Sequence, residues 1–185
     1  MKVYTRQGDD GTTGLLFGGR VPKDAPGPAA YGTTDEAIAA LGLARAETPH
    51  DGELAELLVR LQRELFVVGA ELATAPENRT KLEPGRTLVT AEMVTALEPL
   101  IDAITDRFDA PKEFVLPGET RVAAALDVAR TVVRRAERES VSATTVGWIE
   151  PGSQVVPYLN RLADLCWTLA RWQEGEFRPA RTPKP

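Results

Sequence analysis

Apolar residues recur every three to four positions along much of this chain, a spacing typical of helices with one buried face. The clearest example is a stripe made of Leu54, Leu57, Leu58, Leu61, Leu65, Val68 and Leu72. It predicts an amphipathic helix of about five turns.

The same spacing predicts four further helices. They cover about residues 33–47, 90–108, 119–141 and 157–173. In the first of them, Thr33 or Thr34 is expected to cap the helix, with Asp35 and Glu36 in its first turn. Pro99 should kink or split the 90–108 helix, because proline lacks a backbone N–H. Pro157 is tolerated in the first turn of the last helix.

Glycine and proline interrupt this pattern at both ends. Residues 1–29 hold five glycines between Gly8 and Gly19, followed by three prolines, and form either an ordered loop or a disordered arm. A short strand near residues 2–5 is possible. Residues 175–185 are expected to be a flexible tail. We therefore predict an all-α fold, a single five-helix up-and-down bundle spanning residues 1–185.

Composition narrows the function. The 185 residues fit one domain, and 43% of them are hydrophobic. A net charge of -5 argues against binding to nucleic acid or an anionic membrane surface. No long apolar segment occurs, so we expect a cytoplasmic protein. The chain has one cysteine, Cys166, and one histidine, His50, which lies in a turn-like segment. These are too few for a zinc site built from cysteine and histidine, and a catalytic triad would have to use His50 as its base.

One helix carries the densest candidate chemistry. On a helical wheel of the 119–141 segment, five apolar residues form a stripe about 80° wide. A second group borders it over about 100°, and it consists of Arg130, Arg134, Glu137 and Arg138. Guanidinium groups on one edge repel each other unless an anion meets them, and phosphate suits their paired donors. The alternative is an ordinary solvated charged face.

The glycine-rich N-terminal segment is the second candidate. Glycines allow backbone N–H groups to surround phosphate oxygens, threonine hydroxyls add donors, and Lys23 could add a positive charge. The segment is not a Walker A loop, and it could equally be a flexible terminus.

Three single residues have two interpretations each. Asp35 could cap a helix or take part in a site. Asn160 could be a polar residue of the helix surface or a ligand-binding residue. Phe114, beside Pro117-Gly118, could anchor a loop in the core or face a ligand.

Taken in order, six segments resemble the PduO-type ATP:cob(I)alamin adenosyltransferase family over nearly the whole chain. They are Tyr4-Thr5-Arg6-x-Gly8-Asp9-x-Gly11-x-Thr13-Gly14, Arg20-Val21-Pro22-Lys23-Asp24, Ala30-Tyr31-Gly32-Thr33-x-Asp35-Glu36, Phe114-Val115-Leu116-Pro117-Gly118, Ala129-Arg130-Thr131-Val132-x-Arg134-Arg135-Ala136-Glu137-Arg138 and Tyr158-Leu159-Asn160-Arg161-Leu162-x-Asp164. Each segment alone is a weak indication, whereas six at family spacing are specific.

The resemblance implies a homotrimer with active sites between subunits and an arm, residues 1–29, that wraps ATP. It implies ATP-binding roles for Thr5, Arg6, Gln7, Gly8, Thr13, Gly14, Lys23, Arg134, Glu137, Arg138 and Asn160. Asp35 is expected to pair with Arg130 across the subunit boundary, and Phe114 to close the lower face of the corrin ring. Catalysis would then rest on Arg130, Arg134, Phe114 and Asp35.

The implied reaction joins the 5′ carbon of ATP to the cobalt of cob(I)alamin and releases triphosphate. Cob(I)alamin is itself the nucleophile, so the protein must supply positioning and positive charge rather than a base. Mg²⁺ is expected on the phosphates, without a protein metal site. A cobalamin reductase and an adenosylcobalamin-dependent enzyme are possible partners.

The chain departs from the family pattern at four positions: Gln7 stands where threonine is usual, Glu119 replaces a glycine, Asp127 stands where histidine is frequent, and Val133 where cysteine is frequent. Glu119 adds a negative charge near the expected corrinoid pocket. Two other functions remain open at this point, a different ATP-using phosphotransferase on the same fold and a non-catalytic carrier of nucleotide or corrinoid.

Overall fold

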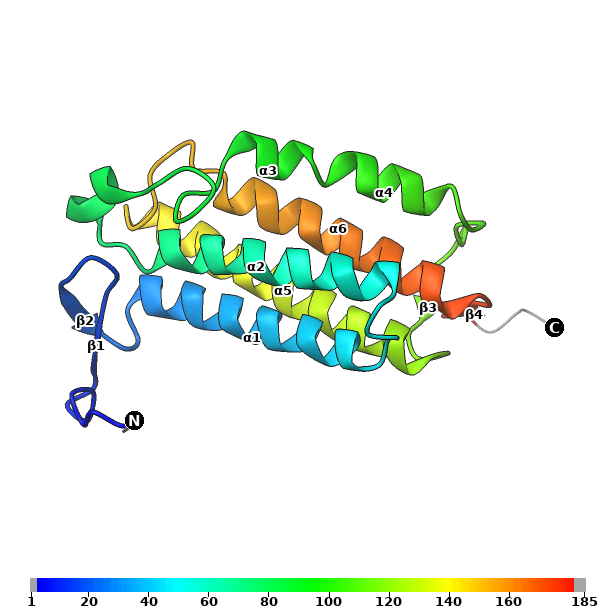
Figure 1. The fold of residues 1–185 in the computed structure, drawn as a ribbon, viewed down its shortest axis with the longest axis horizontal. Coiled ribbons are helices and arrows are strands. Elements are labelled where there is room, and N and C mark those ends of the chain that lie inside the picture. Colours follow the sequence, from blue (N-terminus) through cyan, green and yellow to red (C-terminus); the bar gives the residue numbers. More distant parts are fainter. Residues whose placement is uncertain (1–2, 182–185) are drawn as a thin grey trace.

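The computed structural model describes residues 3–181, and most of these residues are helical (Figure 1). The helices are α1 (Pro26–Ala46), α2 (Glu53–Leu72), the 3-10 helix η1 (Pro76–Lys81), α3 (Ala91–Thr95), α4 (Glu98–Thr105), α5 (Arg121–Thr145) and α6 (Val155–Glu174). The strands are β1 (Thr12–Gly14), β2 (Arg20–Pro22), β3 (Val115–Leu116) and β4 (Arg178–Pro179).

Four long helices, α1, α2, α5 and α6, lie side by side and form the bundle (Figure 1). Helix α1 packs against α5 and α2, α5 packs against α6, and α3 and α4 lie along α6. The predicted leucine stripe of α2 is buried, as Leu58, Leu61 and Leu65 have no exposed surface. Ala129, Val133 and Ala136 of α5 are equally buried, which confirms the apolar stripe predicted for that helix.

Residues 3–181 hold six α-helices rather than the predicted five, because the expected 90–108 helix is split. Helix α3 ends at Thr95 and α4 begins at Glu98, so that Pro99 lies in the first turn of α4. Proline is tolerated there, because the backbone N–H that it lacks would have no carbonyl partner within the helix. The split is one of the two outcomes expected from Pro99.

Helix α1 begins at Pro26, seven residues earlier than predicted, so residues 26–29 of the expected arm belong to the bundle. The predicted cap at Thr33 or Thr34 is therefore wrong. Both threonines are buried inside the helix, and their hydroxyls donate to the carbonyls of Ala29 and Ala30, each at 2.9 Å. Asp35 consequently lies in the middle of α1, not in its first turn.

The two chain ends also differ from expectation. Val3–Thr5 form no strand, and residues 1–2 lie outside the described residues. The short antiparallel pair near this end is instead β1 with β2. Part of the expected loose tail is ordered, because β4 pairs with β3. Residues 182–185 of that tail lie outside the described residues.

Trp148, in the loop after α5, contacts the end of α2 and the first turn of α1. Its indole Nε1 donates to the carbonyl of Leu72 at 2.8 Å. A methyl group on Gly27 would lie 2.1 Å from the indole ring, so only glycine allows Trp148 to lie this close to the first turn of α1. None of the helices in residues 3–181 is long and apolar enough to cross a lipid bilayer.

Candidate active site

The basic edge of α5 is open on one side and tied to α6 on the other. Asn160 of α6 donates through Nδ2 to the Oε1 atom of Glu137 at 3.0 Å. Arg134 and Arg138 are exposed, and within residues 3–181 neither forms an ion pair with a carboxylate. Arg138 donates only to the backbone carbonyl of Arg134, at 3.0 Å. The edge therefore presents two guanidinium groups that are available to an anion.

The neighbouring Arg135 shows the contrast. Its guanidinium pairs with Glu36 of α1, so it serves the packing of α5 against α1. Each residue advances about 100° around a helix, and Arg134 and Arg135 therefore meet different neighbours.

The N-terminal arm, residues 3–25, has a defined structure rather than a random one. Strands β1 and β2 pair with Thr13 opposite Val21, and the backbone N–H of Lys23 donates to the carbonyl of Gly11 at 2.9 Å. The Lys23 ammonium nitrogen lies 3.1 Å from the position that a side-chain carbon on Gly8 would occupy. Glycine at position 8 thus allows a lysine charge to lie directly over the backbone of the turn.

Arg20 organises this arm, and sequence reasoning did not single it out. Its guanidinium donates to the carbonyl of Gln7 and to the Thr12 hydroxyl, the latter at 2.7 Å through Nη2. Asp10 in turn accepts from the Thr12 backbone N–H at 2.9 Å, and these bonds lower the pKa of the Asp10 carboxyl. Arg20 opens one of the six segments that carry the family resemblance, and that position was the signal available in the sequence.

Phe114 is 87% exposed, so the interpretation as a buried loop anchor is wrong. It stands at the rim of a hollow of about 510 Å³ between the β3 loop and the ends of α5 and α6. The hollow is lined by Pro111, Lys112, Glu113, Phe114, Val115, Pro117, Asp127, Arg130, Trp167 and Arg171. A mainly apolar loop facing two arginines suits a large ligand with both apolar and anionic parts.

Arg130 has a partner within its own chain. Its Nε donates to the Oδ1 atom of Asp127, one turn earlier on α5, at 2.9 Å. Asp35, the partner expected from the resemblance, is exposed on α1 and forms no ion pair or side-chain hydrogen bond within residues 3–181. Within residues 3–181 of one chain, Asp35 and Arg130 therefore form no ion pair.

The charge of Glu119 is compensated. Its Oε1 atom lies 3.0 Å from the Nε atom of Arg178 in β4. The ordered tail thus offsets the departure that the sequence placed beside the expected corrinoid pocket.

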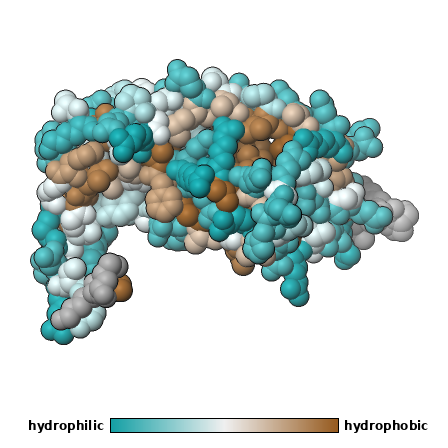
Figure 2. Space-filling model, viewed as in Figure 1, coloured by the Kyte–Doolittle hydropathy of each residue, from teal (hydrophilic) through white to brown (hydrophobic). Residues whose placement is uncertain are grey.

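Apart from Asp35 on α1, the predicted site residues fall into three groups. Arg134, Glu137, Arg138 and Asn160 lie on the α5–α6 edge, and Arg130 and Phe114 share the hollow at the far end of α5. Thr5, Arg6, Gln7, Gly8, Thr13, Gly14 and Lys23 lie on the arm. No side-chain hydrogen bond within residues 3–181 joins this arm to the α5–α6 edge. Figures 1 and 2 show the arm projecting from one end of the bundle, with open space beside the arm and below the helices in this view.

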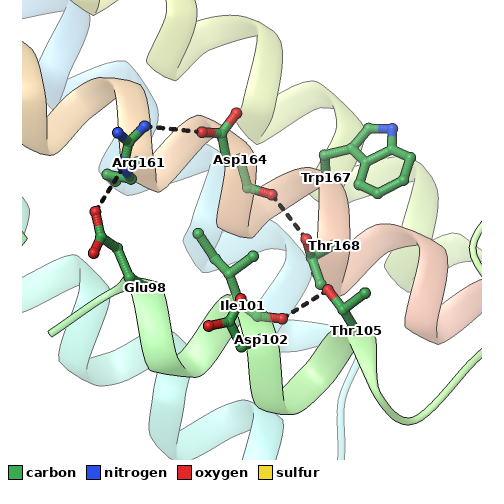
Figure 3. A pocket seen from close by; sticks show the side chains of 8 residues that line it. All are labelled: Glu98, Ile101, Asp102, Thr105, Arg161, Asp164, Trp167 and Thr168. Carbon is green, nitrogen blue, oxygen red and sulfur yellow. Dashed lines mark hydrogen bonds and ion pairs between the residues drawn. The ribbon is translucent and has the colours of Figure 1, made fainter. Parts of the chain in front are cut away.

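A second hollow, of about 530 Å³, lies between α4 and α6 (Figure 3). Arg161 bridges Glu98 and Asp164 there, at 3.2 Å and 3.4 Å. None of the predicted site residues lines it, and only Trp167 borders both hollows. Because Arg161 is already paired with two carboxylates, this hollow is less suited to binding an anion than the α5–α6 edge is.

The single cysteine and the single histidine both lie outside the candidate site. Burial raises the pKa of Cys166 to about 12, so the side chain is a neutral thiol. His50 is exposed in the turn before α2, as predicted. Among residues 3–181, no three His, Cys, Asp or Glu side chains gather in a way that could hold a metal ion.

The fold and site together define a helical-bundle protein with an unpaired arginine edge and a glycine-rich hairpin arm. Residues 3–173 match the family described as cobalamin adenosyltransferase. A corrinoid adenosyltransferase from Citrobacter freundii is 40% identical over 173 residues, which cover 94% of this chain and 95% of the relative. One from Bacillus subtilis is 41% identical over 174 residues, covering 92% and 86%.

Among solved structures, a variant PduO-type ATP:corrinoid adenosyltransferase from Lactobacillus reuteri, complexed with cobalamin and ATP, has a TM-score of 0.85 at 31% identity. The match covers 98% of this chain and 100% of that one. The chain belongs to the PduO-type cobalamin adenosyltransferase family, and the resemblance inferred from the six sequence segments is confirmed.

Proposed function

We propose that this chain transfers the 5′-deoxyadenosyl group of ATP to the cobalt of cob(I)alamin. The electron pair of cobalt(I) forms the cobalt–carbon bond, the C5′–O bond breaks, and its electrons leave with the triphosphate oxygen. The observation that carries this proposal is the open pair Arg134 and Arg138, on the helix that also supplies Arg130 to the hollow beside Phe114.

The arginine edge has the charge that the leaving group needs. Triphosphate departs with added negative charge, and preformed guanidinium donors stabilise that charge without reorganising. Glu137 and Asn160 hold each other at 3.0 Å and would orient the nucleoside end. Thr5, Arg6, Gln7, Gly8, Thr13, Gly14 and Lys23 of the arm are proposed to enclose the phosphates, with Mg²⁺ held by phosphate oxygens and water.

The hollow beside Phe114 suits the corrinoid. An exposed aromatic ring on a loop can fill the lower axial space of the cobalt and exclude water, which favours a four-coordinate cobalt that is easier to reduce. Arg130 lines the same hollow and, with Asp35 of a neighbouring copy, would position the corrin ring.

A homotrimer would complete this site. The arm is not joined to the arginine edge of its own chain, and Asp35 lacks a partner within residues 3–181. Asp35 shares the exposed face of α1 with Ala39 and with Leu43, which is 54% exposed. Exposed apolar side chains such as Leu43 favour coverage of this face by another subunit. Light scattering should give three times the chain mass of 20.1 kDa, and a monomer would contradict the proposal.

Product analysis tests the reaction. Incubation with ATP and chemically reduced cobalamin should yield a light-sensitive cobalt–carbon product together with triphosphate. Release of ADP would favour a phosphotransferase, and binding without turnover would favour a carrier. Arg134→Ala, prepared in the same way, should abolish most of the product, because it removes a donor for the leaving triphosphate. The fold should be kept, since Arg134 is exposed and forms no ion pair within residues 3–181.

The proposed reaction also requires one enzyme that supplies its reduced substrate and another that uses its product. Cob(I)alamin must come from a reductase, and the product must pass to an adenosylcobalamin-dependent enzyme. Cytoplasmic residence is part of the proposal, since ATP, the adenosyl donor, is an intracellular substrate.

A further inference from the structure

Asp127 is a buried carboxylate that binds two arginines, one on each of its oxygens. Only 4% of the residue is exposed. Its Oδ1 atom accepts from Nε of Arg130 at 2.9 Å, and its Oδ2 atom accepts from Nη2 of Arg171 in α6. A buried carboxylate that accepts from two cationic donors is held in one orientation.

The contact with Asp127 uses only the Nε atom of Arg130 and leaves its two Nη groups available to a ligand. Asp127 holds it through Nε, and within residues 3–181 the two Nη groups have no other side-chain partner. The Arg130 side chain is 27% exposed, and both Asp127 and Arg130 line the hollow beside Phe114. The ion pair therefore fixes the arginine at its base while its outer donors face the hollow.

Arg171 extends the pair into a chain of alternating charges. Its side chain is 2% exposed, its guanidinium carbon lies 5.9 Å from the centre of the Trp167 ring, and its Nε lies 2.8 Å from Oε2 of Glu174. The last contact is an ion pair without an aligned hydrogen bond. Arg130, Asp127, Arg171 and Glu174 thus alternate in sign from the hollow to the end of α6.

We propose that Asp127 is a positioning residue for Arg130 in the corrinoid pocket, and that Arg171 is the buried countercharge that holds Asp127 in place. The inference rests on the proposed function, because it assumes that the hollow takes the corrinoid. It assigns a purpose to the aspartate that stands where the family often has histidine. A neutral imidazole could not accept from two arginines at once.

The test compares Asp127→Asn with the wild type and with Asp102→Asn, which alters an exposed carboxylate of α4. Asparagine keeps the shape and removes the charge. We expect kcat/KM for reduced cobalamin to fall about tenfold or more, and the KM for ATP to change less than about twofold. The spectrum of bound cob(II)alamin with ATP should show a smaller four-coordinate fraction in Asp127→Asn only.

A triple variant, Asp127→Asn with Arg171→Met and Glu174→Gln, separates positioning from simple charge neutralisation. It removes all three buried charges of this alternating chain, so the melting temperature should recover while corrinoid use stays impaired. Recovery of corrinoid use, or wild-type kinetics in Asp127→Asn, would overturn the inference. If the wild type makes no adenosylcobalamin, the proposed function fails, whereas equal cob(II)alamin spectra in wild type and Asp127→Asn would refute the positioning role by itself.

Discussion

The backbone N–H of Ala180 donates to the carbonyl of Phe114 at 2.7 Å. With the pairing of Val115 opposite Pro179 and Leu116 opposite Arg178, this bond fastens the end of the chain to the loop that carries the exposed phenylalanine. The C-terminal strand therefore supports the loop that places Phe114 at the rim of the hollow.

Replacing Ala180 with proline should weaken this attachment, because proline has no backbone N–H. We expect turnover of reduced cobalamin to fall about three- to tenfold, with the KM for ATP unchanged within about twofold. Ala180→Gly keeps the donor and is the matched control. Equal losses in the glycine and proline variants would show that the hydrogen bond is not what matters. Steady-state kinetics with each substrate varied in turn supply the measurement.

Truncating the ring itself should have a larger effect. Phe114→Ala is expected to lower kcat about 10- to 100-fold while the KM for ATP changes less than about threefold. Phe66→Ala, which removes another exposed ring from α2, should leave both parameters near the wild type. Parallel loss of ATP affinity and turnover in Phe114→Ala would argue against a role confined to the corrinoid.

Adjacent arginines of α5 should differ sharply. Arg134→Ala should lower kcat/KM for ATP about 10²- to 10³-fold, as expected for loss of one preformed donor to the leaving group. Arg135→Ala should cost less than about threefold in rate, since Arg135 pairs with Glu36. Similar losses at both positions would mean that the overall charge of the helix, and not its open edge, sets the rate.

Cys166 should resist thiol reagents in the folded protein. Burial raises its pKa from 9.0 to about 12, so almost no thiolate exists at pH 8, and the side chain has no exposed surface. Labelling should appear only on unfolding. Because the folded state keeps the proton to higher pH, the stability of the wild type relative to Cys166→Ala should be constant below pH 9. Above pH 9 it should fall by about 1.4 kcal/mol per pH unit until about pH 12. Fast labelling of native protein at pH 8 would contradict this.

Gly27 should tolerate no side chain. A methyl group there would meet the Trp148 ring at 2.1 Å, and we expect Gly27→Ala to lower the free energy of unfolding by about 1–3 kcal/mol. Gly69, also inside a long helix, has no atom within 4 Å of its added methyl, so Gly69→Ala should be neutral or stabilising by up to about 1 kcal/mol. Thermal unfolding of the two variants tests the contrast, and a stable Gly27→Ala would show that the Trp148 contact can shift at little cost.

Helix periodicity carried most of the fold prediction, because the apolar stripe of α2 and the stripe and arginine edge of α5 depend only on positions along one helix. The start of α1 did not follow from such local signals. Thr33 and Thr34 look like caps in the sequence, but their hydroxyls satisfy the helix backbone from within, and Pro26 begins the helix instead.

The candidate site, too, was determined partly by local sequence and partly by tertiary packing. Arg134, Glu137 and Arg138 share one helix edge, so the sequence by itself determined that they face one direction, and six spaced segments identified the family. Only the tertiary structure decided that Asp127 is buried between Arg130 and Arg171, and that the tail supports Phe114. The Asp127–Arg171 contact joins residues 44 positions apart, and the Phe114–Ala180 contact joins residues 66 positions apart. Whether the Asp127 carboxylate is buried or solvated depends on which helices pack together, and no local pattern in the sequence determines that.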